Sequence, residues 1–171
     1  MNTIFFDVDT QLDFVCPAGS LYVPRAETRI PVIAALNRRA RRLVSTVDAH
    51  PENDSEFRAW PPHCIVGTWG QRKPAETLVG GSQIIFEKTT TDAFLDPRLL
   101  PLLSELNAER YVVYGVVTEI CVRFAALGLL KIGKPVDLVT DAVEMLNAEA
   151  RDAFYAEFTA RGGRLVTSAT V

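Results

Sequence analysis

The run Tyr111-Val112-Val113-Tyr114-Gly115-Val116-Val117 is short and apolar, and the amphipathic segment Glu119–Ile132 follows it directly. A second short apolar run, Val136–Val139, comes immediately after that segment. A strand that is buried on both faces has a nearly continuous apolar sequence, and parallel strands are joined by a crossover that is usually a helix. The stretch 111–139 therefore predicts a strand, a helix and a second strand parallel to the first.

The same alternation extends over the rest of the chain, whose 171 residues suit a single domain. Four further strands are expected at Thr3–Val8, Leu43–Val47, Gln83–Phe86 and Arg164–Thr167, and three further helices at Glu27–Arg42, Leu99–Leu106 and Ala148–Ala160. Such alternation is typical of an α/β fold. We expect one domain over residues 1–171 with three layers, in which helices cover both faces of a doubly wound, mostly parallel six-stranded sheet.

The composition argues against several classes of function. The formal net charge is -3, and the densest basic group, Arg38–Arg42, has the spacing of a solvated helix face, so nucleic acid is not an expected partner. No apolar stretch approaches the ~18 residues of a membrane span, and the start of the chain lacks the pattern of a signal peptide. Cys16, Cys64 and Cys121 are widely spaced, as expected of free thiols. We expect a cytoplasmic protein without a membrane partner.

Reactive side chains occur at the ends of four predicted strands. Asp9 ends the first strand, Asp48 and His50 follow the second, Lys88 follows the third, and Cys121 follows the fourth. Ligands of open α/β sheets bind outside the carboxyl ends of the strands, where the strand order reverses. We therefore expect these five residues to lie at one edge of the sheet and to form the functional site.

Cys121 is the candidate nucleophile because it lies in the first turn of a predicted helix. The helix dipole and the Lys88 ammonium are expected to stabilise its thiolate, and Asp9 can accept the thiol proton. The backbone N–H groups of Val117 and Cys121 are candidates for the oxyanion hole. Taken singly, Cys121 could also be a buried small residue, Asp9 a loop acid and Lys88 a solvated charge.

Asp48, His50 and His63 form a separate constellation in the long connection between the second and third strands. One carboxylate and two imidazoles suit one divalent transition metal, with zinc expected and iron or manganese as alternatives. Glu56 or Asp54 could complete its shell, or water could. The alternative is that both histidines only bind backbone groups of the loop.

Two aromatic residues, Phe14 and Trp60, are the expected walls of a small substrate pocket if the long connection folds over the sheet edge. Their alternative role is to pack that connection onto the sheet.

Four ordered motifs give the chain a resemblance to a known family. They are Asp7–Phe14 with Pro17–Pro24, Asp48–Asn53 with Trp60–Thr68, Glu87-Lys88, and Tyr114–Val122 with its Thr-Glu-Ile-Cys-Val segment. On these motifs the chain resembles the isochorismatase-like cysteine hydrolases, and within them it is most similar to nicotinamidases. The resemblance covers nearly the whole chain.

This resemblance implies a cysteine-dependent amidohydrolase. Cys121 would form a thioester acyl-enzyme with a small amide, most simply nicotinamide, release ammonia, and then be freed by water. The resemblance also implies a cis Val116–Val117 peptide and a homo-oligomer. Two departures keep other substrates open, such as carbamoyl, ureido or other small amides. Glu56 stands where some nicotinamidases have a third histidine, and Thr89–Phe94 lacks a longer insertion found in them.

Two rival interpretations come from other classes. Phe6-Asp7-Val8-Asp9-Thr10 resembles the nucleophile motif of haloacid-dehalogenase-type phosphatases, which would make Asp7 the nucleophile. That reading leaves Cys121 unexplained, and Thr140–Glu144 is a poor match for the late acidic pair. The second rival is a non-catalytic α/β scaffold, against which the intact set of Asp9, Lys88 and Cys121 argues.

Overall fold

The computed structural model describes residues 2–171, which contain a six-stranded sheet with parallel neighbours throughout. The strand order is β3-β2-β1-β4-β5-β6. The strands are β1 (Thr3–Val8), β2 (Leu43–Asp48), β3 (Gln83–Lys88), β4 (Arg110–Val116), β5 (Val136–Glu144) and β6 (Arg164–Val166). The chain adds β2 and β3 on one side of β1 and then β4, β5 and β6 on the other. The order thus reverses between β1 and β4, where a ligand crevice is expected.

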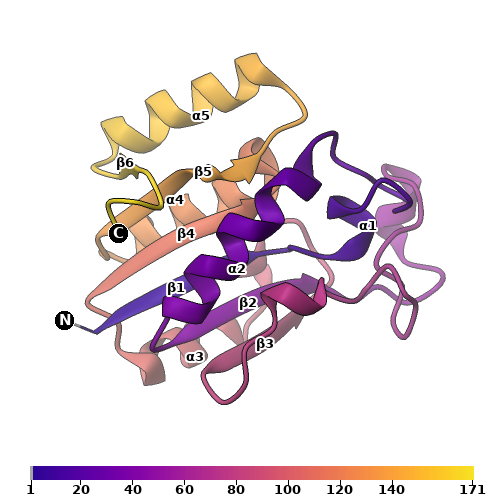
Figure 1. Ribbon diagram of the computed structural model, residues 1–171, viewed down its shortest axis with the longest axis horizontal. Coiled ribbons are helices and arrows are strands. Elements are labelled where there is room, and N and C mark those ends of the chain that lie inside the picture. Colours follow the sequence, from indigo (N-terminus) through magenta and orange to yellow (C-terminus); the bar gives the residue numbers. More distant parts are fainter. Residues whose placement is uncertain (1) are drawn as a thin grey trace.

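Helices cover both faces of this sheet, which confirms the predicted α/β architecture (Figure 1). The helix α2 (Ile30–Arg39) lies on one face, whereas α3 (Leu99–Leu106) and α4 (Arg123–Lys131) lie on the other. The helix α5 (Ala148–Ala160) packs beside α4 and β6. None of the helices within residues 2–171 is long and apolar enough to cross a membrane.

The central strands β1 and β4 are buried on both faces. Tyr111, Val112, Val113 and Tyr114 are at most 1% exposed, as the continuous apolar run predicted. Gly115 has a φ of 120°, and a Cβ atom there would lie 2.1 Å from the carbonyl oxygen of Val8. The close approach of β4 to β1 therefore requires glycine at this position, just before the end of β4.

Several element boundaries differ from the sequence-based prediction. The predicted helix Glu27–Arg42 is a 3-10 turn (Ala26–Arg29) followed by α2, and α2 ends at Arg39 because the carbonyl of Arg42 accepts a hydrogen bond from Phe5 in the sheet. The predicted strand Val136–Val139 continues to Glu144. Its polar residue Thr140 is accommodated because its hydroxyl donates to the carbonyl of Val166, 3.0 Å away.

Short helices also interrupt segments that were predicted to be loops. The helix α1 (Leu12–Val15) follows β1, and 3-10 turns occupy η2 (Ser55–Arg58), η3 (Ala75–Thr77) and η4 (Ala93–Leu95). The predicted helix Glu119–Ile132 begins instead with the π-helical turn η5 (Thr118–Val122), after which α4 starts at Arg123.

Candidate active site

The register of the strands brings three site residues together. Asp48 and Lys88 are the last residues of β2 and β3, and they are directly paired across these strands. Asp9 follows β1, and its backbone N–H donates to the carbonyl of Thr46 in β2 at 3.1 Å. All three residues are at most 2% exposed. The sequence prediction placed them at one sheet edge, and the structure confirms that placement.

A buried chain of charges connects these side chains. Nζ of Lys88 lies 2.8 Å from Oδ2 of Asp9 and 2.5 Å from Oδ1 of Asp48. Burial disfavours the charge on Lys88, but the two carboxylates outweigh burial and hold its pKa well above its usual range. Burial raises the pKa of Asp9 despite the opposing effect of Lys88. Asp9 can therefore accept a proton, while Lys88 stays charged.

Cys121 lies in η5, the turn that follows β4, and it is 8% exposed. The Val116–Val117 peptide just before this turn is cis, which confirms the prediction. Burial raises the pKa of the Cys121 thiol well above its usual value, and the Lys88 ammonium opposes this only in part. Lys88 thus acts in the predicted direction, but the expected net lowering of the thiol pKa was wrong because desolvation outweighs the nearby positive charge. Cys121 needs a base to become a nucleophile.

Asp48, His50 and His63 have ligand atoms that all lie within 4.8 Å of one another. Nδ1 of His50 contacts Oδ2 of Asp54 at 3.0 Å, and Nδ1 of His63 contacts the carbonyl of Pro61 at 2.7 Å. These contacts leave Nε2 of each ring facing Oδ2 of Asp48 at 3.9 Å. Nε2 of His50 is buried and has no hydrogen-bond partner among the described residues. Imidazoles oriented in this way by outer partners fit a divalent metal.

The two acidic candidates for completing this metal shell lie in different places. Asp54 accepts hydrogen bonds from the backbone of Glu56 at 2.9 Å and is occupied on its other oxygen by His50. Glu56 instead lines the pocket that also contains Asp48 and His63. The geometry therefore favours Glu56 over Asp54 as a further ligand.

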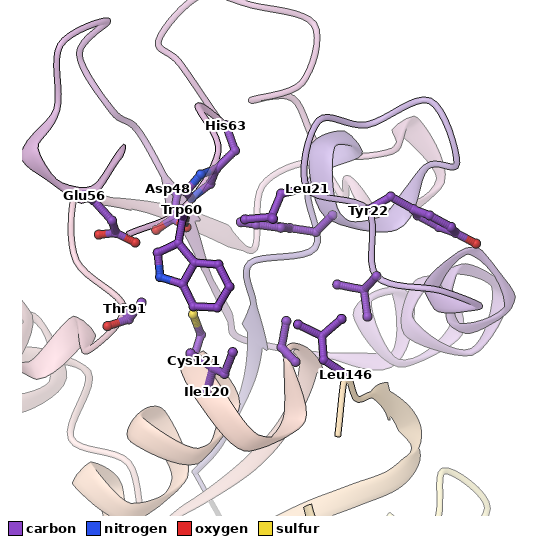
Figure 2. A pocket seen from close by; sticks show the side chains of 13 residues that line it. Leu21, Tyr22, Asp48, Glu56, Trp60, His63, Thr91, Ile120, Cys121 and Leu146 are labelled. Atoms are coloured by element: carbon purple, nitrogen blue, oxygen red, sulfur yellow. Dashed lines mark ion pairs between the residues drawn. The ribbon is translucent and has the colours of Figure 1, made fainter. Parts of the chain in front are cut away.

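A pocket with about 440 Å³ of empty space, including its open mouth, connects the metal cluster with Cys121 (Figure 2). Both predicted aromatic walls line it: Phe14 packs against His63 with ring centroids 5.4 Å apart, and Trp60 lines the same pocket as Cys121. Six further lining residues were not predicted from the sequence: Leu21, Tyr22, Val23, Thr91, Ile120 and Leu146. These residues belong to loops and turns, so they could not be located from their position at the end of a predicted strand.

Residues 3–170 match the family model of the isochorismatase domain. The chain belongs to the isochorismatase family. The nicotinamidase of Escherichia coli (strain K12) is 26% identical over 199 residues, which cover 95% of this chain and 93% of that relative. A streptothricin hydrolase of Streptomyces noursei is 33% identical over 135 residues, covering 79% of this chain and 47% of that protein. The crystal structure of the pyrazinamidase of Pyrococcus horikoshii in complex with zinc has a TM-score of 0.88 and 31% identity, covering 98% of this chain and 99% of that one.

Gln11 supports the site of this isochorismatase-family chain without lining the pocket. Its side-chain amide donates to the carbonyl of Asp48 at 2.8 Å, and its side-chain oxygen accepts the N–H of Asp48 at 2.7 Å. Both backbone polar groups of Asp48 are thus held by one side chain. The motif Asp7–Phe14 contained this residue, but the sequence offered no partner for it.

Asp7 does not have the surroundings of a phosphatase nucleophile. It is fully buried, and its carboxylate accepts hydrogen bonds from Thr10, Asn37 and Lys73 at 2.5, 3.0 and 2.8 Å. These donors use the lone pairs that an attacking carboxylate would need. Together with membership of the isochorismatase family, this geometry argues against the phosphatase interpretation.

Proposed function

We propose that this protein is a cysteine-dependent amidohydrolase that cleaves the C–N bond of a small amide, with nicotinamide as the leading substrate. The observation that carries the proposal is the buried Asp9–Lys88 pair next to Cys121, which lines a mainly apolar pocket. Nicotinamidases among its relatives support an amide substrate. A non-catalytic scaffold gives no reason to bury these charges next to a thiol.

The proposed reaction has two stages. In the first, Asp9 takes the thiol proton and Sγ of Cys121 attacks the amide carbonyl carbon, with the oxyanion bound by the backbone N–H groups of Val117 and Cys121. Asp9 then returns the proton to the leaving nitrogen, so ammonia departs and a thioester remains. In the second stage, Asp9 deprotonates a water that attacks the thioester carbon, the C–S bond breaks, and the Cys121 sulfur takes the proton back from Asp9. The carboxylic acid is released and the free enzyme is restored. Lys88 stays protonated throughout and keeps Asp9 oriented.

We further propose that Asp48, His50 and His63 hold one divalent metal, with Glu56 completing the protein shell. Zinc is the leading candidate because the ligand set is one carboxylate and two imidazoles, and a similar pyrazinamidase structure contains zinc. A bound metal would supply a Lewis acid in the pocket wall. Asp54 orients His50 rather than binding the metal directly.

Another small amide is the alternative substrate. The streptothricin hydrolase relative supports this alternative because a protein 33% identical over 135 residues of alignment is named for a substrate other than nicotinamide. Carbamoyl and ureido compounds belong to the same alternative. A single-domain organisation, a homo-oligomeric assembly and a cytoplasmic location stay predictions from the sequence.

The proposal is tested by measuring ammonia release from nicotinamide and pyrazinamide by the wild type and by Cys121→Ala. Bound metal is quantified on the same samples. We expect turnover by the wild type, no turnover by the variant, and about one metal per chain. Equal turnover by both proteins would refute the cysteine mechanism. If the metal-loaded wild type turns over neither nicotinamide nor pyrazinamide, the substrate is another amide.

A further inference from the structure

A second buried ion pair lies below the active site and takes no part in the proposed reaction. Nζ of Lys73 lies 2.8 Å from Oδ2 of Asp7, and the two side chains are at most 3% exposed. The carboxylate of Asp7 also accepts hydrogen bonds from Thr10 and Asn37, and Ser45 lies 3.3 Å away. A charged pair that has been desolvated to this extent is costly to bury, so its position calls for an explanation.

Lys73 makes one further contact, and this contact leads to the catalytic machinery. Its Nζ donates to the backbone carbonyl of Thr10 at 3.2 Å, while the Thr10 hydroxyl donates to Asp7 at 2.5 Å. Thr10 is the residue directly after Asp9. Both its peptide carbonyl and its side chain are therefore fixed by the buried ion pair.

The backbone of Asp9 needs such support. Asp9 has a φ of 50°, in the left-handed region that residues other than glycine rarely adopt. In this conformation Oδ2 of Asp9 lies 2.8 Å from Nζ of Lys88. The Thr10 carbonyl belongs to the peptide between Thr10 and Gln11, and the N–H of that same peptide donates to the carbonyl of Asp9 at 2.8 Å. A shift of this peptide would therefore alter the backbone of Asp9 and with it the direction of the Asp9 side chain.

The segment that carries Lys73 runs alongside the whole catalytic motif. The N–H groups of Leu12 and Asp13 donate to the carbonyls of Arg72 and Gly70 at 2.8 and 3.0 Å. The side-chain amide of Gln11 donates to the carbonyl of Gln71 at 2.8 Å. Residues 70–73 thus form hydrogen bonds with each of residues 10–13. Among these hydrogen bonds, only the one from Lys73 involves a charged side chain.

We propose that Lys73, through Asp7 and the Thr10 carbonyl, is a positioning residue that fixes the direction of the Asp9 carboxylate. Lys73 does not line the pocket, and its Nζ is bound to Asp7 and to the Thr10 carbonyl. Its removal should therefore reduce proton transfer by Asp9 and leave substrate binding nearly unchanged.

The test compares Lys73→Met with Tyr114→Phe. The hydroxyl of Tyr114 donates to Oδ1 of Asn37 at 2.6 Å, so Tyr114→Phe disturbs the same network at its far end, away from Thr10. For Lys73→Met we expect kcat for nicotinamide to fall about 10- to 100-fold while KM changes less than about twofold. Tyr114→Phe should lower the free energy of unfolding but leave kcat at the wild-type value.

A second readout does not depend on the substrate. Alkylation of Cys121 by iodoacetamide at pH 7 should slow in Lys73→Met, because the thiol needs Asp9 to take its proton. The half-buried Cys16 serves as the internal reference and should react at its wild-type rate. If the wild type does not hydrolyse nicotinamide, the proposed substrate fails, but the comparison of alkylation rates still tests the role of Lys73.

Lys73→Met leaves the Asp7 charge buried and unpaired, so this variant could fail to fold. The double variant Asp7→Asn/Lys73→Met removes both charges and still lacks the donor to the Thr10 carbonyl. It should show the same loss of kcat and the same slow alkylation. Wild-type kcat and alkylation in a folded Lys73 variant, or a rise in KM with unchanged kcat, would overturn the proposal.

Discussion

Nζ of Lys88 lies 2.5 Å from Oδ1 of Asp48, while Oδ2 of the same carboxylate faces the rings of His50 and His63. Asp48 thus belongs both to the candidate metal cluster and to the charged chain that ends at Asp9. Burial would raise the pKa of Asp48, but Lys88 and His50 outweigh it and lower that pKa. Asp48 is therefore an anion that links the two parts of the site.

Lys88→Met should lower kcat by at least about 100-fold, because Asp9 and Asp48 would then be buried side by side without their shared cation. The assay is ammonia release from nicotinamide. Lys131→Met is the matched control, since Lys131 is exposed and is the last residue of α4, whereas Cys121 precedes the first residue of that helix. Near-wild-type kcat in Lys88→Met would show that the buried lysine has no role in the reaction.

Asp9→Asn should lower kcat by about 10²- to 10⁴-fold, the usual contribution of a general base, and should slow alkylation of Cys121 at pH 7. The reason is that the pKa of the buried Cys121 thiol is raised, so little thiolate forms without a base. Asp152→Asn, at an exposed position of α5, is the control. An Asp9→Asn enzyme whose Cys121 reacts at the wild-type rate would contradict the assignment of Asp9 as the base.

His63→Ala should abolish stoichiometric metal binding, because it removes one of three clustered ligands. Asp54→Asn should weaken the metal affinity by only about 10- to 100-fold, the usual effect of losing an outer partner of a ligand. Both effects are measured by elemental analysis and by competition with a chelator. An unchanged metal content in His63→Ala would exclude this cluster as the site.

Two buried tyrosines of β4 should respond in opposite ways to loss of the hydroxyl. Tyr114→Phe should cost about 1–3 kcal/mol in the free energy of unfolding, because it leaves Oδ1 of Asn37 buried without its donor. The hydroxyl of Tyr111 has no partner among residues 2–171, so Tyr111→Phe should be neutral or stabilising at pH 7. Urea denaturation measures both, and a large loss in Tyr111→Phe would contradict the prediction.

The buried hydroxyl of Tyr111 also makes the free energy of unfolding depend on pH. Burial raises the pKa of Tyr111 to about 12, above its unfolded value near 10. The folded state therefore favours the protonated form, so this contribution to stability is complete below pH 10 and is lost as the pH rises toward 12. Between pH 8 and pH 11, Tyr111→Phe should gain about 1 kcal/mol relative to the wild type. A constant difference across this range would exclude the shift.

Hydrophobic patterning was enough to predict the sheet and the edge at which the reactive residues meet. The strand Thr3–Val8 has the predicted bounds, and four of its six residues are buried. The end of β5 was missed because Thr140 and Asp141 interrupt its apolar run. Asp141 is accommodated only through Ser168, whose N–H and hydroxyl donate to it at 2.8 and 2.6 Å. Because Ser168 is 27 residues from Asp141, this pairing produces no pattern in the local sequence.

The candidate site shows the same contrast between features that local sequence pattern predicts and features that depend on distant parts of the chain. Asp9, Lys88 and Cys121 could be predicted because each stands at a strand end, where position in the chain fixes position in space. The direction of the pKa shift of Cys121 could not, since it depends on how completely neighbouring elements remove water. The role of Lys73 was also invisible, because its partners Asp7 and Thr10 lie more than 60 residues away.

The central claim is that Cys121 forms a covalent acyl-enzyme. The most direct measurement is rapid acid quenching of the enzyme during nicotinamide turnover, followed by mass spectrometry of the peptide that contains Cys121. The account predicts a mass increase equal to one nicotinoyl group on Cys121, and its accumulation when release of the acid is slower than release of ammonia. Sustained ammonia release by Cys121→Ala, or an acyl group found on another residue, would contradict it.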